Sequence, residues 1–234
     1  FSLSQSLGTI YGTLMHAFLA QIEWLEDYRL DQRALRREAL ATLDAELLQH
    51  VDIERVIAEF EDLIHLPNVR RVLQRSRYQQ PLFGFVPDRV EVERERPISL
   101  VEGDQLRQGT IDRMALLFSQ DELVAVEIFD YKTDAFDPRL TLLWLDDRLQ
   151  QHRPQMDTYT HAVSQLFGLP LDRIATYLVM LSSDDLLRVE SSEVAAASMR
   201  ANPPKPHSGS RAIQARGAGS PSLASASEQL PRDL

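Results

Sequence analysis

The spacing of apolar residues changes part-way along this chain, and the change limits the folds it can adopt. Up to Pro81, apolar residues recur every three or four positions over 14–25, 35–48 and 53–66, with Pro67 expected to end the last helix. This spacing is typical of one face of an α-helix. The first of these apolar faces consists of Leu14, Phe18, Ile22 and Leu25.

After Pro81 the segments become short, rich in Val, Ile and Phe, and separated by polar loops, which predicts three strands in a meander. A helix over 149–167 with a stop at Gly168 and a buried fourth strand over 174–181 follow. The sequence therefore predicts an α/β domain with a helical N-terminal part and a central mixed sheet flanked by helices. The three meander strands are expected over 89–100, 109–118 and 123–131.

From 203 to 234 the chain is dominated by Pro, Ser, Gly and Ala, so this segment is expected to be a disordered tail behind a folded part over 1–202. The first residue is Phe1, and an apolar helical pattern starts soon after it. We interpret the chain as a piece of a longer protein.

Composition excludes several classes of protein. No apolar stretch approaches the roughly 20 residues that span a bilayer, so we expect no membrane association. The absence of Cys excludes disulfides, zinc-thiolate sites, Cys nucleophiles and iron-sulfur clusters, and fits a cytoplasmic protein. A net charge of −10 argues against coating duplex DNA by bulk electrostatics. Neither Lys132 nor Lys205 lies in a phosphate-cradling P-loop.

Two acidic residues and one lysine are the strongest chemical signal. Asp130 and Lys132 end the third expected strand and face the same side, since side chains alternate along a strand. A three-residue hairpin loop over 120–122 would place Asp112 opposite Asp130 on that face, and a four-residue loop would place them on opposite faces. On the same face, the two carboxylates and the ammonium would suit an Mg²⁺-assisted attack on a phosphodiester.

The surrounding motifs resemble the RecB-type nuclease domains of the PD-(D/E)xK superfamily, which are fused to or partnered with repair helicases. The similar elements occur in the family's order over roughly 8–180. They are the first helix at 12–19 (GTLMHAFL), Arg94-Glu95-Arg96-Pro97, Gly109-Thr110-Ile111-Asp112-Arg113, 126–134 (VEIFDYKTD), and Gln155-Met156-Asp157-Thr158-Tyr159.

The resemblance implies a restriction-endonuclease-like core over about 85–185 behind a helical part over about 8–80. It implies that Asp112 and Asp130 bind Mg²⁺ or Mn²⁺, and that Lys132 positions the water or stabilises the transition state. It also implies that the His16 side chain and the Tyr131 backbone carbonyl complete the metal shell.

Other residues carry two interpretations each. Glu95 supports the metal site by resemblance, or is simply paired with the neighbouring arginines. Gln155 and Tyr159 lie one helical turn apart and either reach the DNA or are ordinary helix residues. The densest basic run either grips phosphates or is a solvated face. This run consists of Arg70, Arg71, Arg75 and Arg77.

The function implied by the resemblance is a divalent-metal-dependent DNase, the nuclease module of a helicase-nuclease in double-strand-break repair. Its partners would be DNA, as single strands or ends, and a helicase motor in the same longer chain or in another subunit. Two alternatives remain open: an inactive DNA-binding or scaffold relative, and a nuclease acting on RNA or in defence.

Overall fold

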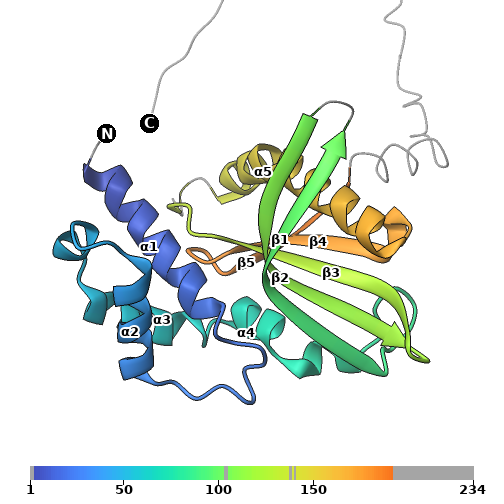
Figure 1. The fold of residues 1–234 in the computed structure, drawn as a ribbon, viewed down its shortest axis with the longest axis horizontal. Coiled ribbons are helices and arrows are strands. Elements are labelled where there is room, and N and C mark those ends of the chain that lie inside the picture. Colours follow the sequence, from blue (N-terminus) through green and yellow to red (C-terminus); the bar gives the residue numbers. More distant parts are fainter. Residues whose placement is uncertain (1–2, 103–104, 137–138, 140, 192–234) are drawn as a thin grey trace, which may run out of the picture.

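The computed structural model describes residues 3–102, 105–136, 139 and 141–191, so the expected tail over 203–234 lies outside the described residues. In the described part, five strands form one mixed sheet in the order β1-β2-β3-β4-β5 (Figure 1). The strands are β1 Arg89–Glu102, β2 Gln105–Ser119, β3 Glu122–Lys132, β4 Ile174–Met180 and β5 Asp185–Val189. The helices are α1 Leu3–Leu19, α2 Gln32–Thr42, η1 Leu47–His50, α3 Ile53–Leu63, α4 Pro67–Leu73, η2 Arg75–Gln79, α5 Thr141–Phe167 and η4 Leu171–Arg173.

The sheet separates two hydrophobic layers, as the predicted α/β class requires. Helices α1 to α4 pack with Ala125, Phe129 and Tyr131 on one face, and α5 packs with Val126 and Ile128 on the other. This alternation along β3 buries the strand on both sides. Strands β3 and β4 are parallel and are joined through α5, so the long helix is the crossover connection of the sheet.

Local capping explains several helix starts. The side chain of Asp31 accepts hydrogen bonds from the first turn of α2, and that of Asp52 does the same for α3. The prediction for Pro67 is corrected: α3 ends at Leu63, and Pro67 is the first residue of α4, where a missing N–H costs nothing. The carboxylate of Asp184 accepts from two backbone amides in that first turn of α4.

The turn between β2 and β3 is shorter than both the three-residue and the four-residue loop considered from the sequence. Ser119 pairs with Glu122, and the two residues between them, Gln120 and Asp121, have φ of 52° and 65°. One register shift follows, between the pairs of Leu117 and Phe118. A two-residue turn and a one-residue bulge add up to the same offset as a three-residue loop, so the later register is the predicted one.

Strand β1 bends at Glu95, whose φ of 48° is rare for a residue with a side chain (Figure 1). Before the bend, Val90 and Val92 contact the layer of α1 to α4; after it, Ile98 and Leu100 belong to the α5 layer. The distal part of the β1–β2 hairpin therefore leaves the plane of the sheet.

Other elements also differ from the prediction: the first helical face was expected over 14–25, but α1 ends at Leu19, so Ile22 and Leu25 lie beyond the helix. Helix α5 begins at Thr141, eight residues before the expected start at 149, and β5 was not predicted because it is short and includes a charged residue. Although α5 is long, no helix in the described part of the chain combines the length and apolarity needed to cross a membrane.

Candidate metal centre and its lysine

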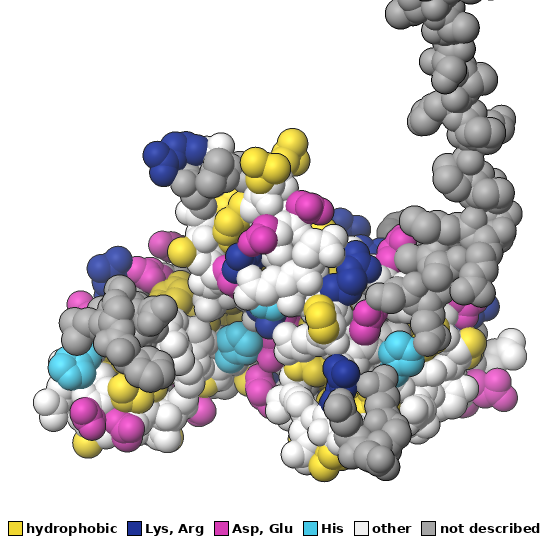
Figure 2. Space-filling view, turned by 90° about the horizontal axis from the view of Figure 1, so that it is seen from above, with side chains coloured by type: hydrophobic (Ala, Val, Ile, Leu, Met, Phe, Trp, Pro, Cys, Tyr) yellow, Lys and Arg dark blue, Asp and Glu magenta, His cyan; other side chains and the backbone are white. Residues whose placement is uncertain are grey.

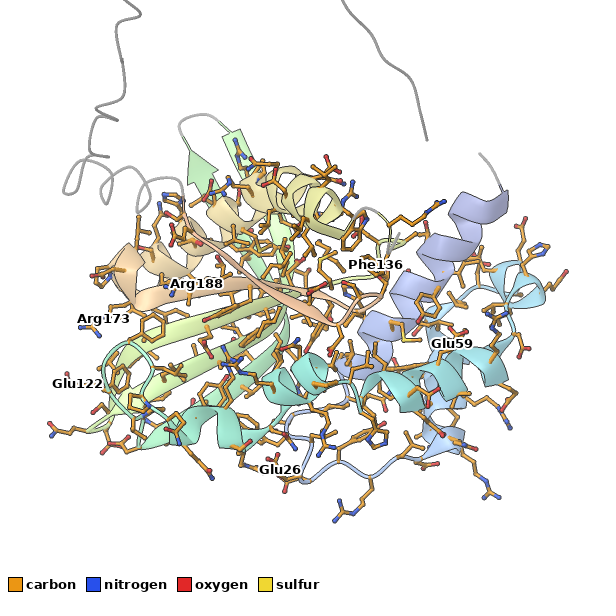
Figure 3. All side chains as sticks on the ribbon, turned by 180° about the vertical axis from the view of Figure 1, so that it is seen from behind. Glu26, Glu59, Glu122, Phe136, Arg173 and Arg188 are labelled. Atoms are coloured by element: carbon orange, nitrogen blue, oxygen red, sulfur yellow. The ribbon has the colours of Figure 1, made fainter. Side chains whose placement is uncertain are left out.

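The candidate site residues gather where β3 ends and the β1–β2 hairpin leaves the plane of the sheet (Figure 1). The β2–β3 ladder runs up to the pair of Arg113 and Phe129, and continuing it by one residue places Asp112 opposite Asp130. Figure 3 shows Phe136, just after β3, near this end of the sheet, and Glu122, at the start of β3, near the other end. In Figure 2, histidine and acidic side chains occupy the middle of the face between the N-terminal helices and the rest of the molecule.

Asp112 is a buried carboxylate with two partners. Its Oδ2 accepts a hydrogen bond of 2.6 Å from the backbone N–H of Tyr131, and its Oδ1 lies 3.2 Å from His16 Nδ1. The amide of Tyr131 lies beyond the last β2–β3 pair, so Asp112 continues the connection between the strands through its side chain. Both oxygens are therefore held in position, which suits a metal ligand.

His16 reaches the site because α1 approaches the end of β3 closely. A Cβ at Gly12, one helical turn earlier, would lie 2.8 Å from the Thr133 hydroxyl, so a larger residue there would push the helix away. Although burial opposes it, the hydrogen bond and charge of Asp112 raise the pKa of His16. The imidazole also meets the Tyr131 ring edge-on.

Glu95 joins these two residues. One ligand atom from each of His16, Glu95 and Asp112 lies within 4.8 Å of the others, a group that could hold a metal ion. Burial and the nearby charge of Asp112 raise the pKa of Glu95. Oxygen ligands with one imidazole suit Mg²⁺ or Mn²⁺, so the donor set fits the expected metal.

Asp130 is held from the other side of the site. Lys132 Nζ lies 2.6 Å from Asp130 Oδ2, and Gln155 Nε2 donates to Asp130 Oδ1 at 3.2 Å. The Gln155 carbonyl oxygen accepts from Lys132 Nζ at 3.1 Å, which closes a three-residue ring of contacts. Burial, together with the charge of Asp112, raises the pKa of Asp130 to about 6 despite the neighbouring ammonium.

Tyr159 supports this ring instead of facing outward. Its hydroxyl accepts from Gln155 at 2.6 Å and donates to the Thr110 carbonyl at 2.8 Å, while its ring is buried. The DNA-contacting role predicted for Tyr159 is therefore corrected to that of a support, whereas half-buried Gln155 stays a predicted contact. Gly109 leaves room for the ring, because a Cβ there would lie 2.9 Å from it.

The predicted basic run does not form one surface. Arg77 is buried and pairs with Glu127 through two hydrogen bonds of 2.7 and 2.8 Å, so its predicted phosphate contact is wrong. Arg75 is paired with Asp27 at 2.6 Å and covers a tryptophan ring. Arg70 lines a separate hollow on the side of α3 and α4. DNA contact by Arg70, Arg71 and Arg75 stays a prediction.

A cluster beside the lysine was missed at the sequence level. Arg148 Nη1 lies 2.8 Å from Asp134 Oδ1, and His152 Nε2 lies 3.6 Å from the other oxygen. Burial and the charge of Lys132 lower the pKa of His152. The spacing of Arg148, His152, Gln155 and Tyr159 along α5 is the one signal that could have revealed this face.

An open groove of about 550 Å³ leads to the candidate ligands His16 and Glu95 from the side of α1 and α2. Its walls are mostly small or polar side chains. The lining residues are Gly12, Thr13, His16, Ala17, Ala20, Glu38, Thr42 and Glu95.

This arrangement of carboxylates and lysine at a strand end agrees with a family comparison, in which the PD-(D/E)XK nuclease superfamily matches residues 3–221. The chain belongs to the PD-(D/E)XK nuclease superfamily. Its mixed sheet with flanking helices is the fold predicted for that superfamily, and the preceding helices form the expected N-terminal part.

Two curated relatives from Streptococcus equi subsp. zooepidemicus are each named as one subunit of an ATP-dependent helicase/nuclease. The protein of strain MGCS10565 is 30% identical over 153 residues, which cover 63% of this chain and 10% of the relative. That of strain H70 is 34% identical over 99 residues, which cover 40% of this chain and 7% of the relative. The chain thus matches only a tenth or less of either relative's length.

Proposed function

We propose that this domain is the nuclease module of a helicase-nuclease and hydrolyses phosphodiester bonds of DNA with Mg²⁺ or Mn²⁺. The single observation that carries the proposal is the convergence of His16, Glu95 and Asp112 within 4.8 Å, beside the buried pair of Asp130 and Lys132. Membership of the nuclease superfamily supports the reaction class. The names of the two relatives support a helicase motor in the same longer chain or in a partner subunit.

The metal site would consist of His16, Glu95 and Asp112, with Asp130 and the Tyr131 carbonyl as further ligands. A divalent ion held by these residues would supply a Lewis acid able to polarise the phosphate and lower the pKa of water. Carboxylates so close together repel one another, and a bound cation would relieve this repulsion.

Lys132 carries the positive charge that the reacting phosphate needs. Its ammonium is mostly buried, and both Asp130 and Gln155 fix its position. A cation held in a partly desolvated site stabilises the charge that develops during in-line attack more strongly than one in water. Tyr159 and Thr110 anchor Gln155, so the lysine is oriented by a chain of hydrogen bonds that crosses from α5 to β2.

We further propose that the substrate is a DNA single strand or end and that the domain acts as an exonuclease in double-strand-break repair in the cytoplasm. The groove beside α1 supports a strand-like substrate, because it opens onto the ligands His16 and Glu95. Arg70, Arg71 and Arg75 remain candidate contacts for more distant phosphates.

The test is cleavage of labelled linear and circular single-stranded DNA, duplex DNA and RNA with Mg²⁺, Mn²⁺ or EDTA. Cleavage of linear DNA that requires metal is expected, together with loss of at least about 100-fold in Lys132→Ala, the size typical of a lost transition-state contact. Asp121→Asn is the matched control, because Asp121 is 99% exposed at the far end of β3.

Four results would each overturn part of the proposal. Wild-type protein that binds DNA without cleaving it would indicate a scaffold. Preference for RNA would assign a different substrate, and cleavage of circular DNA would replace exonuclease with endonuclease action. Lys132→Ala with activity within about tenfold of wild type would remove the lysine from the mechanism.

A further inference from the structure

Arg113 lies one residue after Asp112 and reaches to the opposite side of the sheet. It is among the largest fully buried side chains, with 1% of its surface exposed. Its Nη1 donates to the carbonyl of Ile22 at 3.0 Å, and its Nη2 donates to that of Glu23 at 2.7 Å. A single guanidinium thus clamps two successive carbonyls in the turn that follows α1.

This turn is firmly connected to His16. The amide of Ala20 donates to the His16 carbonyl at 2.9 Å, and that of Ile22 donates to the Leu19 carbonyl at 3.0 Å. Helix α1 therefore passes into the turn without a flexible joint. A shift of the carbonyls that Arg113 holds would be transmitted along the helix to the imidazole.

Asp112 and Arg113 are neighbours on β2, and together they contact both α1 and the turn that follows it. Asp112 contacts His16, and Arg113 contacts the turn six and seven residues later. Trp24 covers the guanidinium, whose carbon lies 5.3 Å from the ring centroid. Water is therefore kept away from the clamp, which strengthens its charge-assisted hydrogen bonds.

Stability alone does not require an arginine here. A buried cation is costly to desolvate, and an apolar side chain of similar volume often serves a core as well or better. An arginine can do what an apolar side chain cannot: its planar guanidinium binds two carbonyl oxygens at once and fixes their position relative to the strand.

We propose that Arg113 is a positioning residue of the metal centre: by clamping the turn after α1 to β2, it sets the distance between His16 and Asp112. This inference rests on the metal-binding role given to both residues under the proposed function. It assigns no contact between Arg113 and the metal or the DNA.

The first test compares the dissociation constant for Mn²⁺ in the wild type and in Arg113→Lys, measured by isothermal titration calorimetry without DNA. A lysine keeps the charge but cannot bridge both carbonyls, so binding is expected to weaken by about tenfold, as for residues that orient metal ligands. Arg77→Lys is the matched control. Arg77 is also a buried arginine on this face, but its carboxylate partner Glu127 lies on β3.

The second test is a double-mutant cycle with His16→Ala. If Arg113 acts through His16, then Arg113→Lys changes the Mn²⁺ affinity of the His16→Ala protein by less than about twofold. A merely structural role would predict the same tenfold loss in both backgrounds. The titrations are run in sucrose, which favours the folded state and keeps weakened variants measurable.

Unchanged Mn²⁺ affinity in Arg113→Lys would overturn the inference, as would an equal loss in Arg77→Lys or an undiminished effect in the His16→Ala background. These outcomes are separate from failure of the proposed function. Wild-type protein that binds Mn²⁺ but cleaves no nucleic acid would refute the nuclease while leaving the positioning role to be decided by the same titrations.

Discussion

Replacing Asp130 with Asn should stabilise the metal-free protein, and the gain should depend on pH. Burial, together with the neighbouring Asp112, raises the pKa of Asp130 from its ordinary 3.8 to about 6. A carboxyl group whose pKa is higher in the folded state binds its proton more tightly there. Ionisation therefore costs the folded protein stability as the pH rises from about 4 to about 6, and the full penalty is present above that window.

The size of the effect follows from the shift. The pKa of Asp130 differs by about two units between the folded and unfolded states. At 1.36 kcal/mol per unit, this lowers the free energy of unfolding by about 3 kcal/mol at pH 7.5. At pH 4.5 the penalty is only about 1 kcal/mol, because the carboxyl of the folded protein is protonated and resembles the amide of Asn. The Asn variant should thus gain about 3 kcal/mol at pH 7.5 and about a third of that at pH 4.5.

Urea unfolding of the wild type and Asp130→Asn at both pH values, with EDTA present, measures this difference. Asp121→Asn controls for the loss of one negative charge, because Asp121 is almost fully exposed. Mn²⁺ at about 1,000 times its dissociation constant should reverse the order at pH 7.5, since binding then stabilises the wild type by about 4.1 kcal/mol, more than the gain of the Asn variant. A gain that is equal at both pH values, or one shared by the control, would refute the proposed electrostatic strain.

Three further changes test the packing around the site. Gly109→Ala should displace the ring of Tyr159, because the new Cβ would lie 2.9 Å from it, and should lower both the melting temperature and Mn²⁺-dependent cleavage; unchanged values would mean that the ring is free to move. Arg77→Met should cost about 3 to 5 kcal/mol in urea unfolding by leaving the Glu127 carboxylate buried and unpaired, and a cost below about 1 kcal/mol would contradict that burial. Asp184→Ala should cost about 1 kcal/mol by uncapping α4, and a neutral effect would show that water replaces the cap.

Most elements of the fold could be predicted because each buries one regular face, and the hydrophobic period reports that face directly. The turn between β2 and β3 was harder. Gln120 and Asp121 both adopt left-handed backbone conformations without the glycine that normally marks such a turn, and the bulge that follows leaves no mark in composition. Asp112 lies opposite Asp130, as a three-residue loop would have placed it, only because the shorter turn and the bulge offset each other.

The site was predictable where a motif names the residue and unpredictable where partners lie far apart in sequence. His16, Asp112 and Lys132 came from the family pattern, and the structure brings all three to one place. The burial of Arg77 depends on Glu127, fifty residues later, so a basic run alone could not reveal it. The position of Arg148 depends likewise on how α5 crosses the end of β3.

The bend at Glu95 also divides the β1–β2 hairpin into segments of unequal local stability. Beyond it, the tip exposes Val101 and Leu106 by 65% and 60%, so the hairpin can open from the tip at little cost. Before it, β2 is buried between two hydrophobic layers over 113–117 and opens only when the whole sheet unfolds. The candidate ligands Glu95 and Asp112 lie at this border. Amide hydrogen exchange should therefore be fast over 105–109 and slow over 114–117, and metal binding would stop the fraying where the two segments meet.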